Sequence, residues 1–171
     1  MDGLGYGVDV INGYADIRYN YFNATRHSVD GFGFETCGYA CEHNLFGPDV
    51  TSHAVDMHCL SENGYSGDLT AGGFMRIRRN TFCFAKNVDG EHAPAIKIRG
   101  YPKEGVFVEA NRFMHTGSEP YENNKGNPCC QVNVNPKADW HEMAFKNNQY
   151  GPGPYNPNVG APIDLTAALP A

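Results

Sequence analysis

The chain has 171 residues, enough for one domain, and its formal net charge of -6 argues against a nucleic-acid backbone as the partner. No apolar run approaches the roughly 20 residues that a membrane span needs, and no signal peptide is visible at the N-terminus. A mean hydropathy of -0.49, with 20 Gly and 11 Pro, suits short strands separated by many turns.

One motif recurs five times along the chain: an Asn followed two residues later by an aromatic ring. The motifs begin at Asn20, Asn44, Asn80, Asn111 and Asn148, at intervals of 24, 36, 31 and 37 residues. A loose period of this length is typical of one supersecondary unit stacked repeatedly on itself. We therefore predict a solenoid of about five coils over residues 1–150. The irregular segment 151–171, rich in Pro and Gly, is predicted to be a C-terminal tail.

The residues just before each Asn align without gaps and show one apolar and one charged position. The apolar column is Ile17, Cys41, Ile77, Val108 and Phe145, and the charged column alternates in sign as Arg18, Glu42, Arg78, Glu109 and Lys146. In strands stacked about 4.8 Å apart, period-two alternation produces an inward column beside an outward one. We predict one strand of a parallel stack here, closed by a ladder of Asn side chains, with aromatic rings filling the interior.

A second strand per coil is predicted from a repeated pair of an inward apolar residue and an outward polar one. The pairs are Val8-Asp9, Val29-Asp30, Val55-Asp56, Ile96-Lys97 and Val132-Asn133. The next outward row reads Ile11, Phe32, His58, Arg99 and Asn135. We predict that the functional site lies on this face, because three acids follow one another along its outward column. Two long connections, 60–71 and 114–129, are expected beside it.

The coil length, the Asn ladder, the stacked aromatics and the strand ends reading I-x-x-N-x-F resemble the right-handed parallel β-helix of the pectate-lyase-like superfamily. The resemblance covers residues 7–150 and implies an all-β fold, but the same helix hosts lyases, hydrolases, epimerases, tailspikes and adhesins. It also implies that a row of acids holds calcium against an acidic sugar, with Lys97 or Arg99 as base. The matching acids are Asp9, Asp30 and Asp56. Paired DD and GHG motifs are absent in that order, which weakens a polygalacturonase reading.

Stacked carboxylates also point to a site without the resemblance. Neighbouring acids at strand spacing repel each other by about 1 kcal/mol in water, and more where water is excluded. Something must offset this repulsion, and a bound calcium ion is the predicted cofactor. The other candidates are Lys97, Arg99, His58 and Arg26. The alternative is that the column is exposed and serves only solubility.

The most concrete function is a lyase that cleaves a uronate-containing polysaccharide by β-elimination. A cation neutralises the sugar carboxylate, and a basic side chain then removes the neighbouring proton. Lys97 is the preferred base, with Arg99 as carboxylate clamp and His58 as the second candidate for the base. The predicted substrate-binding residues are Arg26, Tyr65 and Tyr101. The two tyrosines have an equally strong alternative role as cover for the sides of the solenoid.

Two other functions stay open: a non-catalytic β-helix that binds glycan or serves as a structural, tail-fibre-like element, and a glycoside hydrolase that uses Asp30 and Asp56. A polysaccharide or glycan is the expected partner, and open coil ends predict pairing between copies of the chain. Six cysteines favour an oxidising compartment, so an extracellular or cell-surface location is expected. Because Val8 already lies in a strand register, we also expect a truncated solenoid.

Two histidines and two cysteines carry further expectations. His27 and His53 stand two residues before an inward Val, so they are predicted to stack as a structural pair, with a metal site including His58 as the alternative. His53 and His58 differ in parity, which predicts opposite faces of a strand. A disulfide between Cys59 and Cys83 would tie down the connection 60–71.

Overall fold

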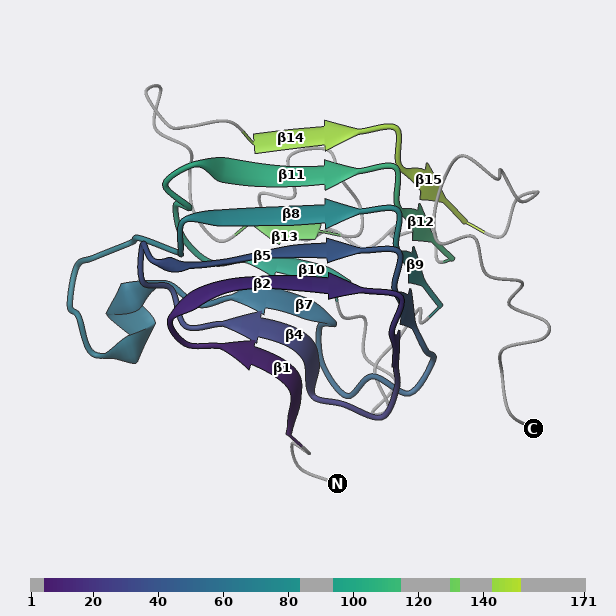
Figure 1. The fold of residues 1–171 in the computed structure, drawn as a ribbon, viewed down its shortest axis with the longest axis horizontal. Helices are drawn as coiled ribbons and strands as arrows, with labels where there is room; N and C mark the ends of the chain where they lie inside the picture. The colour runs from purple at the N-terminus through teal and green to yellow at the C-terminus, as the bar shows by residue number, and fades with distance from the viewer. Residues whose placement is uncertain (1–4, 84–93, 115–129, 133–142, 152–171) are drawn as a thin grey trace.

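The structure is a computed structural model, and it describes residues 5–83, 94–114, 130–132 and 143–151. This part of the chain is all-β, as predicted, and its strands form three parallel sheets of five strands each. Figure 1 shows two of the sheets packed face to face, with the short third sheet at one end. Among the described residues, no helix has the length and apolar character to cross a membrane.

Each coil of the chain contributes one strand to each sheet, in the same order. Sheet A contains β1 (Tyr6–Val10), β4 (His27–Gly31), β7 (Val55–Met57), β10 (Ile96–Ile98) and β13 (Cys130–Val132). Sheet B contains β2 (Gly13–Arg18), β5 (Cys37–Glu42), β8 (Phe74–Arg78), β11 (Gly105–Glu109) and β14 (Met143–Lys146). Sheet C contains β3 (Tyr21–Phe22), β6 (Leu45–Phe46), β9 (Thr81–Phe82), β12 (Arg112–Phe113) and β15 (Gln149–Tyr150). This order is compatible with a parallel β-helix.

Sheet B has the register that the Asn alignment predicts. The apolar column pairs in the expected order from Ile17 to Phe145, and it is buried except at Phe145, which is partly exposed. The charged column beside it forms ion pairs between coils. Arg18 Nη2 lies 3.5 Å from Glu42 Oε2, and Arg78 Nε lies 2.9 Å from Glu109 Oε2. Charge on this face is therefore balanced within the column.

The predicted Asn ladder runs along the corner between sheets B and C. In the first four Asn residues of the ladder, Nδ2 donates to Oδ1 of the Asn one coil later at 3.1 Å, and the backbone N–H donates to the same oxygen at 2.9–3.0 Å. The residue before each Asn has φ between 52° and 58°, although none is Gly: Tyr19, His43, Arg79, Ala110 and Asn147. Because a left-handed backbone is unfavourable for such residues, the ladder's hydrogen bonds hold each corner in a conformation that it would not adopt alone.

The sequence predicts at least two strands per coil, and sheet C adds a third. Its strands have two residues each, and so short a strand carries no alternating pattern in the sequence. The aromatic column lies on this sheet. Successive rings of Phe22, Phe46, Phe82, Phe113 and Tyr150 stack with centroids 4.6–5.4 Å apart.

Sheet A follows the predicted register through four coils and departs from it in the fifth. Val8, Val29, Val55 and Ile96 lie in one row. Ile96 then pairs with Cys130, so Val132 lies opposite Ile98, and Gln131 lies opposite Lys97. A shift of two residues preserves side-chain parity, so alternation alone cannot detect it. The predicted outward residues Asn133 and Asn135 lie outside the described residues.

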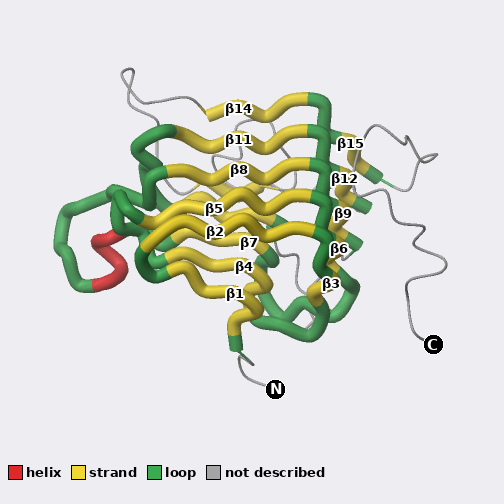
Figure 2. Tube along the Cα trace, in the orientation of Figure 1, coloured by secondary structure: helices red, strands yellow, loops and turns green. Residues whose placement is uncertain are grey.

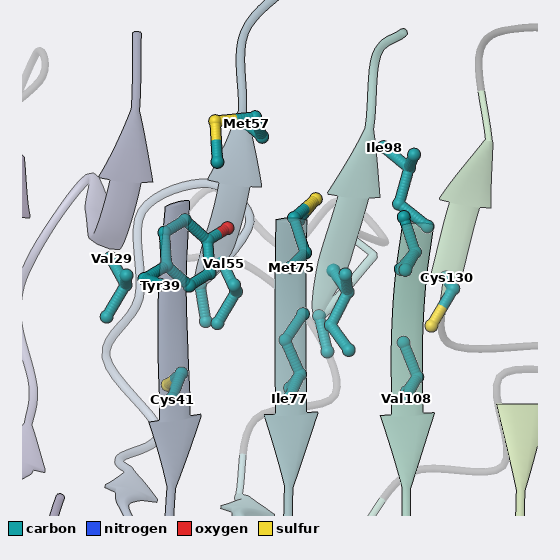
Figure 3. Close-up of a cluster of buried hydrophobic side chains, with 14 of the residues drawn as sticks. Val29, Tyr39, Cys41, Val55, Met57, Met75, Ile77, Ile98, Val108 and Cys130 are labelled. Atoms are coloured by element: carbon teal, nitrogen blue, oxygen red, sulfur yellow. The ribbon is translucent and has the colours of Figure 1, made fainter. Parts of the chain in front are cut away.

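The core lies between sheets A and B. Figure 3 shows Val29, Val55 and Ile98 of sheet A facing Tyr39 and Met75 of sheet B. These side chains have no exposed surface.

Cysteines in the described part of the chain pack as unbonded thiols. Cys41 is buried in the apolar column of sheet B, while Cys59 Sγ lies 3.0 Å from Ser61 Oγ. Cys59 and Cys83 are both free, so the predicted disulfide between them is wrong.

Candidate functional site

The candidate site lies on the outward side of sheet A, where β4, β7 and β10 are neighbours. Strand pairing places Asp9 opposite Asp30 and Asp56 opposite Lys97, in the predicted column. The connection 58–73 between β7 and β8 starts at the end of this sheet and contains a 3₁₀ turn, η1 (Leu60–Asn63), drawn red in Figure 2. The expected neighbourhood of the 60–71 segment and the charged face is confirmed. The other connection, 114–129, lies almost wholly outside the described residues.

The alternative that this column is exposed and serves only solubility does not hold for two of its three acids. Asp9 is exposed, but Asp30 is only 5% exposed and Asp56 has no exposed surface. Period-two alternation assigns a side chain to one side of a sheet, but it does not show what covers that side. Here the covering groups come from other coils.

Asp56 is the centre of the site, and Arg99 is its main partner. Arg99 Nε lies 2.9 Å from both carboxylate oxygens, and Arg99 Nη2 lies 2.7 Å from Oδ2. His53 Nε2 lies 2.8 Å from the same Oδ2. Burial raises the pKa of Asp56, but the hydrogen bonds and charges of His53 and Arg99 outweigh it and hold the pKa below its usual range. Asp56 is therefore a carboxylate, and Arg99 is the partner that offsets its charge.

The prediction that His53 and His58 point to opposite faces is wrong, because both approach Asp56. The amides of the two residues before Asp56 both donate to the carbonyl of Ala95 at 3.0 Å. Two successive amides on one acceptor form a bulge, and a bulge interrupts the alternation of side chains. His53 therefore lies on the same side of the sheet as Asp56.

The predicted stacking of His27 on His53 is confirmed, with ring centroids 4.1 Å apart. His27 Nδ1 also lies 3.1 Å from the His53 carbonyl oxygen. Burial, followed by the neighbouring His53, lowers the pKa of His27 to about 4. His27 is neutral at physiological pH and acts as a structural support beneath the site.

His58 lies between three carboxyl groups. Its Nε2 is 3.6 Å from Asp56 Oδ2 and 3.8 Å from Asp30 Oδ1, and its Nδ1 is 3.3 Å from Glu62 Oε2. Asp30 Oδ1 is buried without a hydrogen-bond partner. Burial, followed by the charges of Asp56 and Asp9, raises the pKa of Asp30 to about 8. At neutral pH Asp30 thus carries a proton, which removes the repulsion that the column of acids would otherwise have.

Lys97 extends the column by one coil and is half-buried. Burial, followed by the charge of Arg99, lowers the pKa of Lys97. In the described part of the chain, no carboxylate lies within ion-pair distance of its ammonium group. Lys97 therefore releases its proton more readily than an exposed lysine does.

The three predicted substrate-binding residues are not brought together. Tyr101 lines an open hollow of about 540 Å³ with residues 66–70, beside the site. Tyr65, on the same connection, is 50% exposed and packs edge-on against Phe34. Arg26 is exposed at the corner before β4, where its charge acts on His27. These positions leave the role of each residue in binding a prediction.

The acids do not fit the predicted calcium ion well. Among the described residues, the groups with metal-binding geometry are Asp30, Asp56 and His58, and His27, His53 and Asp56, so Asp9 belongs to neither. Both oxygens of Asp56 already accept hydrogen bonds from Arg99, whose charge also repels a cation. Calcium prefers six to eight oxygen ligands.

Two residues of the site were not assigned to it from the sequence. Glu62 reaches the site from η1, and its position four residues after His58 in the connection that follows β7 was the available signal. His53 had no usable signal, because the bulge that reorients it leaves no mark in the pattern of residues.

Comparisons of this chain with protein families, curated proteins and solved structures give no match.

Proposed function

We propose that the protein is a right-handed parallel β-helix of the pectate-lyase-like type that cleaves a uronate-containing polysaccharide by β-elimination. The observation that carries this proposal is the gathering of an amine, an imidazole and a carboxyl group, Lys97, His58 and Asp30, on one side of sheet A. Two of the three have displaced pKa values, in opposite directions. Such displaced pairs are typical of acid and base assignments in active sites.

In the proposed reaction, Lys97 in its neutral form takes the proton from the carbon next to the sugar carboxylate. The electron pair of that bond forms a carbon–carbon double bond, and the bond to the leaving glycosidic oxygen breaks. Protonated His58 donates a proton to that oxygen. Asp30, which carries a proton at neutral pH, donates a hydrogen bond to the sugar carboxylate as negative charge develops there.

Arg99 has a different role in this proposal from the carboxylate clamp expected from the sequence. Its guanidinium is held by Asp56 and lies 3.3 Å from Glu62 Oε1, so its fork is not free for a sugar. Arg99 instead fixes Asp56 and lowers the pKa of Lys97. A glycoside hydrolase that uses Asp30 and Asp56 is less well supported, because Asp56 has no exposed surface.

A glycan-binding protein without catalysis is the second candidate. The hollow beside Tyr101 favours it, since an aromatic ring with polar neighbours suits a sugar ring. An extracellular location, pairing between copies and the C-terminal tail also remain predictions.

The test is incubation with a panel of uronate polysaccharides, read by the absorbance of the unsaturated product. We expect Lys97→Ala to abolish product formation while the protein stays folded. The matched control is Lys103→Ala, since Lys103 is an exposed lysine paired with Glu35 at 2.6 Å, away from the site. Product from Lys97→Ala at the wild-type rate excludes Lys97 as the base. Binding of glycan without any product from the wild type rejects the lyase and supports the binding protein.

A further inference from the structure

Glu62 contacts two residues of the site from outside the sheet. Its Oε2 lies 3.3 Å from His58 Nδ1, and its Oε1 lies 3.3 Å from Arg99 Nη1. The residue lies in η1, which is anchored at its far end by a hydrogen bond from Asn63 Nδ2 to the Phe32 carbonyl at 2.6 Å. One carboxylate thus links η1 to Arg99, which follows β10, and to His58 at the start of the connection 58–73.

The Nδ1 atom of His58 needs this carboxylate. Nδ1 is shielded from water and makes no hydrogen bond of good geometry, and Glu62 is the charged group within ion-pair distance of it among the described residues. A buried N–H left without an acceptor costs about 1–3 kcal/mol. A buried lone pair facing the Glu62 carboxylate would be repelled. A small movement of Glu62 that lets Nδ1–H donate to Oε2 satisfies both groups.

A proton on Nδ1 decides what the other ring nitrogen can do. In the neutral imidazole only one nitrogen carries hydrogen, so Nδ1–H leaves a lone pair on Nε2. Nε2 is the atom that lies 3.6 Å from Asp56 Oδ2 and 3.8 Å from Asp30 Oδ1. When protonated His58 acts as the acid of the proposed reaction, an Nδ1–H held by Glu62 makes Nε2 the nitrogen that gives its proton to the leaving oxygen. This nitrogen faces Asp30.

We propose that Glu62 is the positioning residue of this site: it accepts the Nδ1–H of His58 and so directs Nε2 toward Asp30 and the substrate. The effect on rate rests on the proposed function, whereas the effect on the imidazole does not. Simple ion pairing does not account for the arrangement, because a pair in which Glu62 is 34% exposed contributes little to stability. Its value lies in the orientation of the ring.

The first experiment measures the tautomer of His58 by ¹⁵N NMR, at a pH where its shifts show a neutral ring. The His58→Asn variant identifies the signal among the seven histidines. We expect Nδ1–H in the wild type and a shift toward Nε2–H in Glu62→Ala. Glu62→Gln, which retains an acceptor oxygen, should keep most of the Nδ1–H form. A wild-type ring protonated on Nε2, or a tautomer unchanged in Glu62→Ala, overturns the proposal.

The matched control is Glu35→Gln, which removes an exposed acid paired with Lys103 and should leave the His58 signal unchanged. A change of the same size in Glu35→Gln would overturn the proposal, because it would show a general electrostatic effect.

The second experiment measures turnover on the polysaccharide that the wild type cleaves. We expect Glu62→Ala to lower kcat about tenfold or more with KM nearly unchanged, and Glu62→Gln to recover part of the loss. Turnover with an unchanged tautomer in Glu62→Ala rejects the positioning role and keeps the lyase. The expected tautomer change in a protein without turnover rejects the lyase and keeps the positioning role.

Discussion

The outward columns of sheets A and B are built on the same stacked strands, but their charges are arranged differently. On sheet B, Arg18, Glu42, Arg78 and Glu109 alternate in sign and pair between coils at 3.5 and 2.9 Å. On sheet A, three acids succeed one another, and two of them are buried. Sheet B balances charge within its column. On sheet A, the charge of Asp56 is offset by Arg99 from the next outward column, and Asp30 is neutralised by a bound proton.

Because of this difference, the two columns should differ in how much a single substitution destabilises the protein. Partly exposed pairs such as those on sheet B contribute about 0–1 kcal/mol each. A buried charge held by one partner is costly to leave alone, so the cluster on sheet A is sensitive to single changes. The face that tolerates change is the balanced one, while the face that carries unlike titratable groups is the one that depends on each partner.

The largest expected effect separates the two columns directly. Arg99→Ala should lower the free energy of unfolding by about 3–5 kcal/mol, because it leaves the Asp56 carboxylate buried without its main partner. Arg78→Ala on sheet B should cost no more than about 1 kcal/mol. Urea unfolding of both variants measures the difference. Similar losses in the two variants would contradict the distinction between the columns.

A second prediction concerns pH. The pKa of Asp30 is about 8 in the folded protein, against about 3.9 in an unfolded chain, so between these values the folded state holds a proton that the unfolded state has released. Stability from this group is therefore full below pH 4 and falls as pH rises to 8, by at most about 1.4 kcal/mol per pH unit. Asp56, with its lowered pKa, acts oppositely and loses its contribution only in acid below pH 4.

Below about pH 6.5 the lowered pKa of His27 acts in the opposite direction, because unfolded histidine binds a proton there, so the Asp30 effect is measured above that pH. Urea unfolding at pH 7, 7.5 and 8 should therefore show a declining midpoint in the wild type and a flatter profile in Asp30→Asn. Asp16→Asn, which changes an exposed acid on sheet B, is the control and should keep the wild-type slope. A wild-type midpoint that does not decline over this range would mean that Asp30 is ionised in the folded protein.

The smallest expected effect is that of calcium. Because Arg99 already occupies Asp56, excess calcium should stabilise the protein by far less than the roughly 2.7 kcal/mol that a bound ligand gives at a hundredfold excess over Kd. Melting temperatures with calcium and with a chelator measure this. A large saturable rise that Asp30→Asn abolishes would instead establish the calcium site expected from the resemblance.

Sequence patterns predicted those parts of the molecule in which neighbouring coils repeat. The corner of Asn20 and its equivalents has a constant length, so aligning on Asn gave the register of sheet B and the ladder. The fifth strand of sheet A was misplaced because variable connections separate it from the ladder. The side of the sheet on which His53 lies depends on a bulge. The burial of Asp56 and the contacts of Glu62 depend on how other segments pack against sheet A. None of these features leaves a periodic signal in the sequence.

The corners between sheets B and C have one further consequence, for how the molecule can change. All five consist of two residues, as in Tyr19-Asn20 and Ala110-Asn111, whereas the connections from sheet A to sheet B range from 11–12 to 58–73. The ladder therefore holds the corners between sheets B and C at a constant length, while the connections between sheets A and B are free to differ in length. Doubling a loop costs only about 0.6 kcal/mol in closure entropy. Segments beside the candidate site can thus be exchanged or lengthened while the stacked frame stays the same.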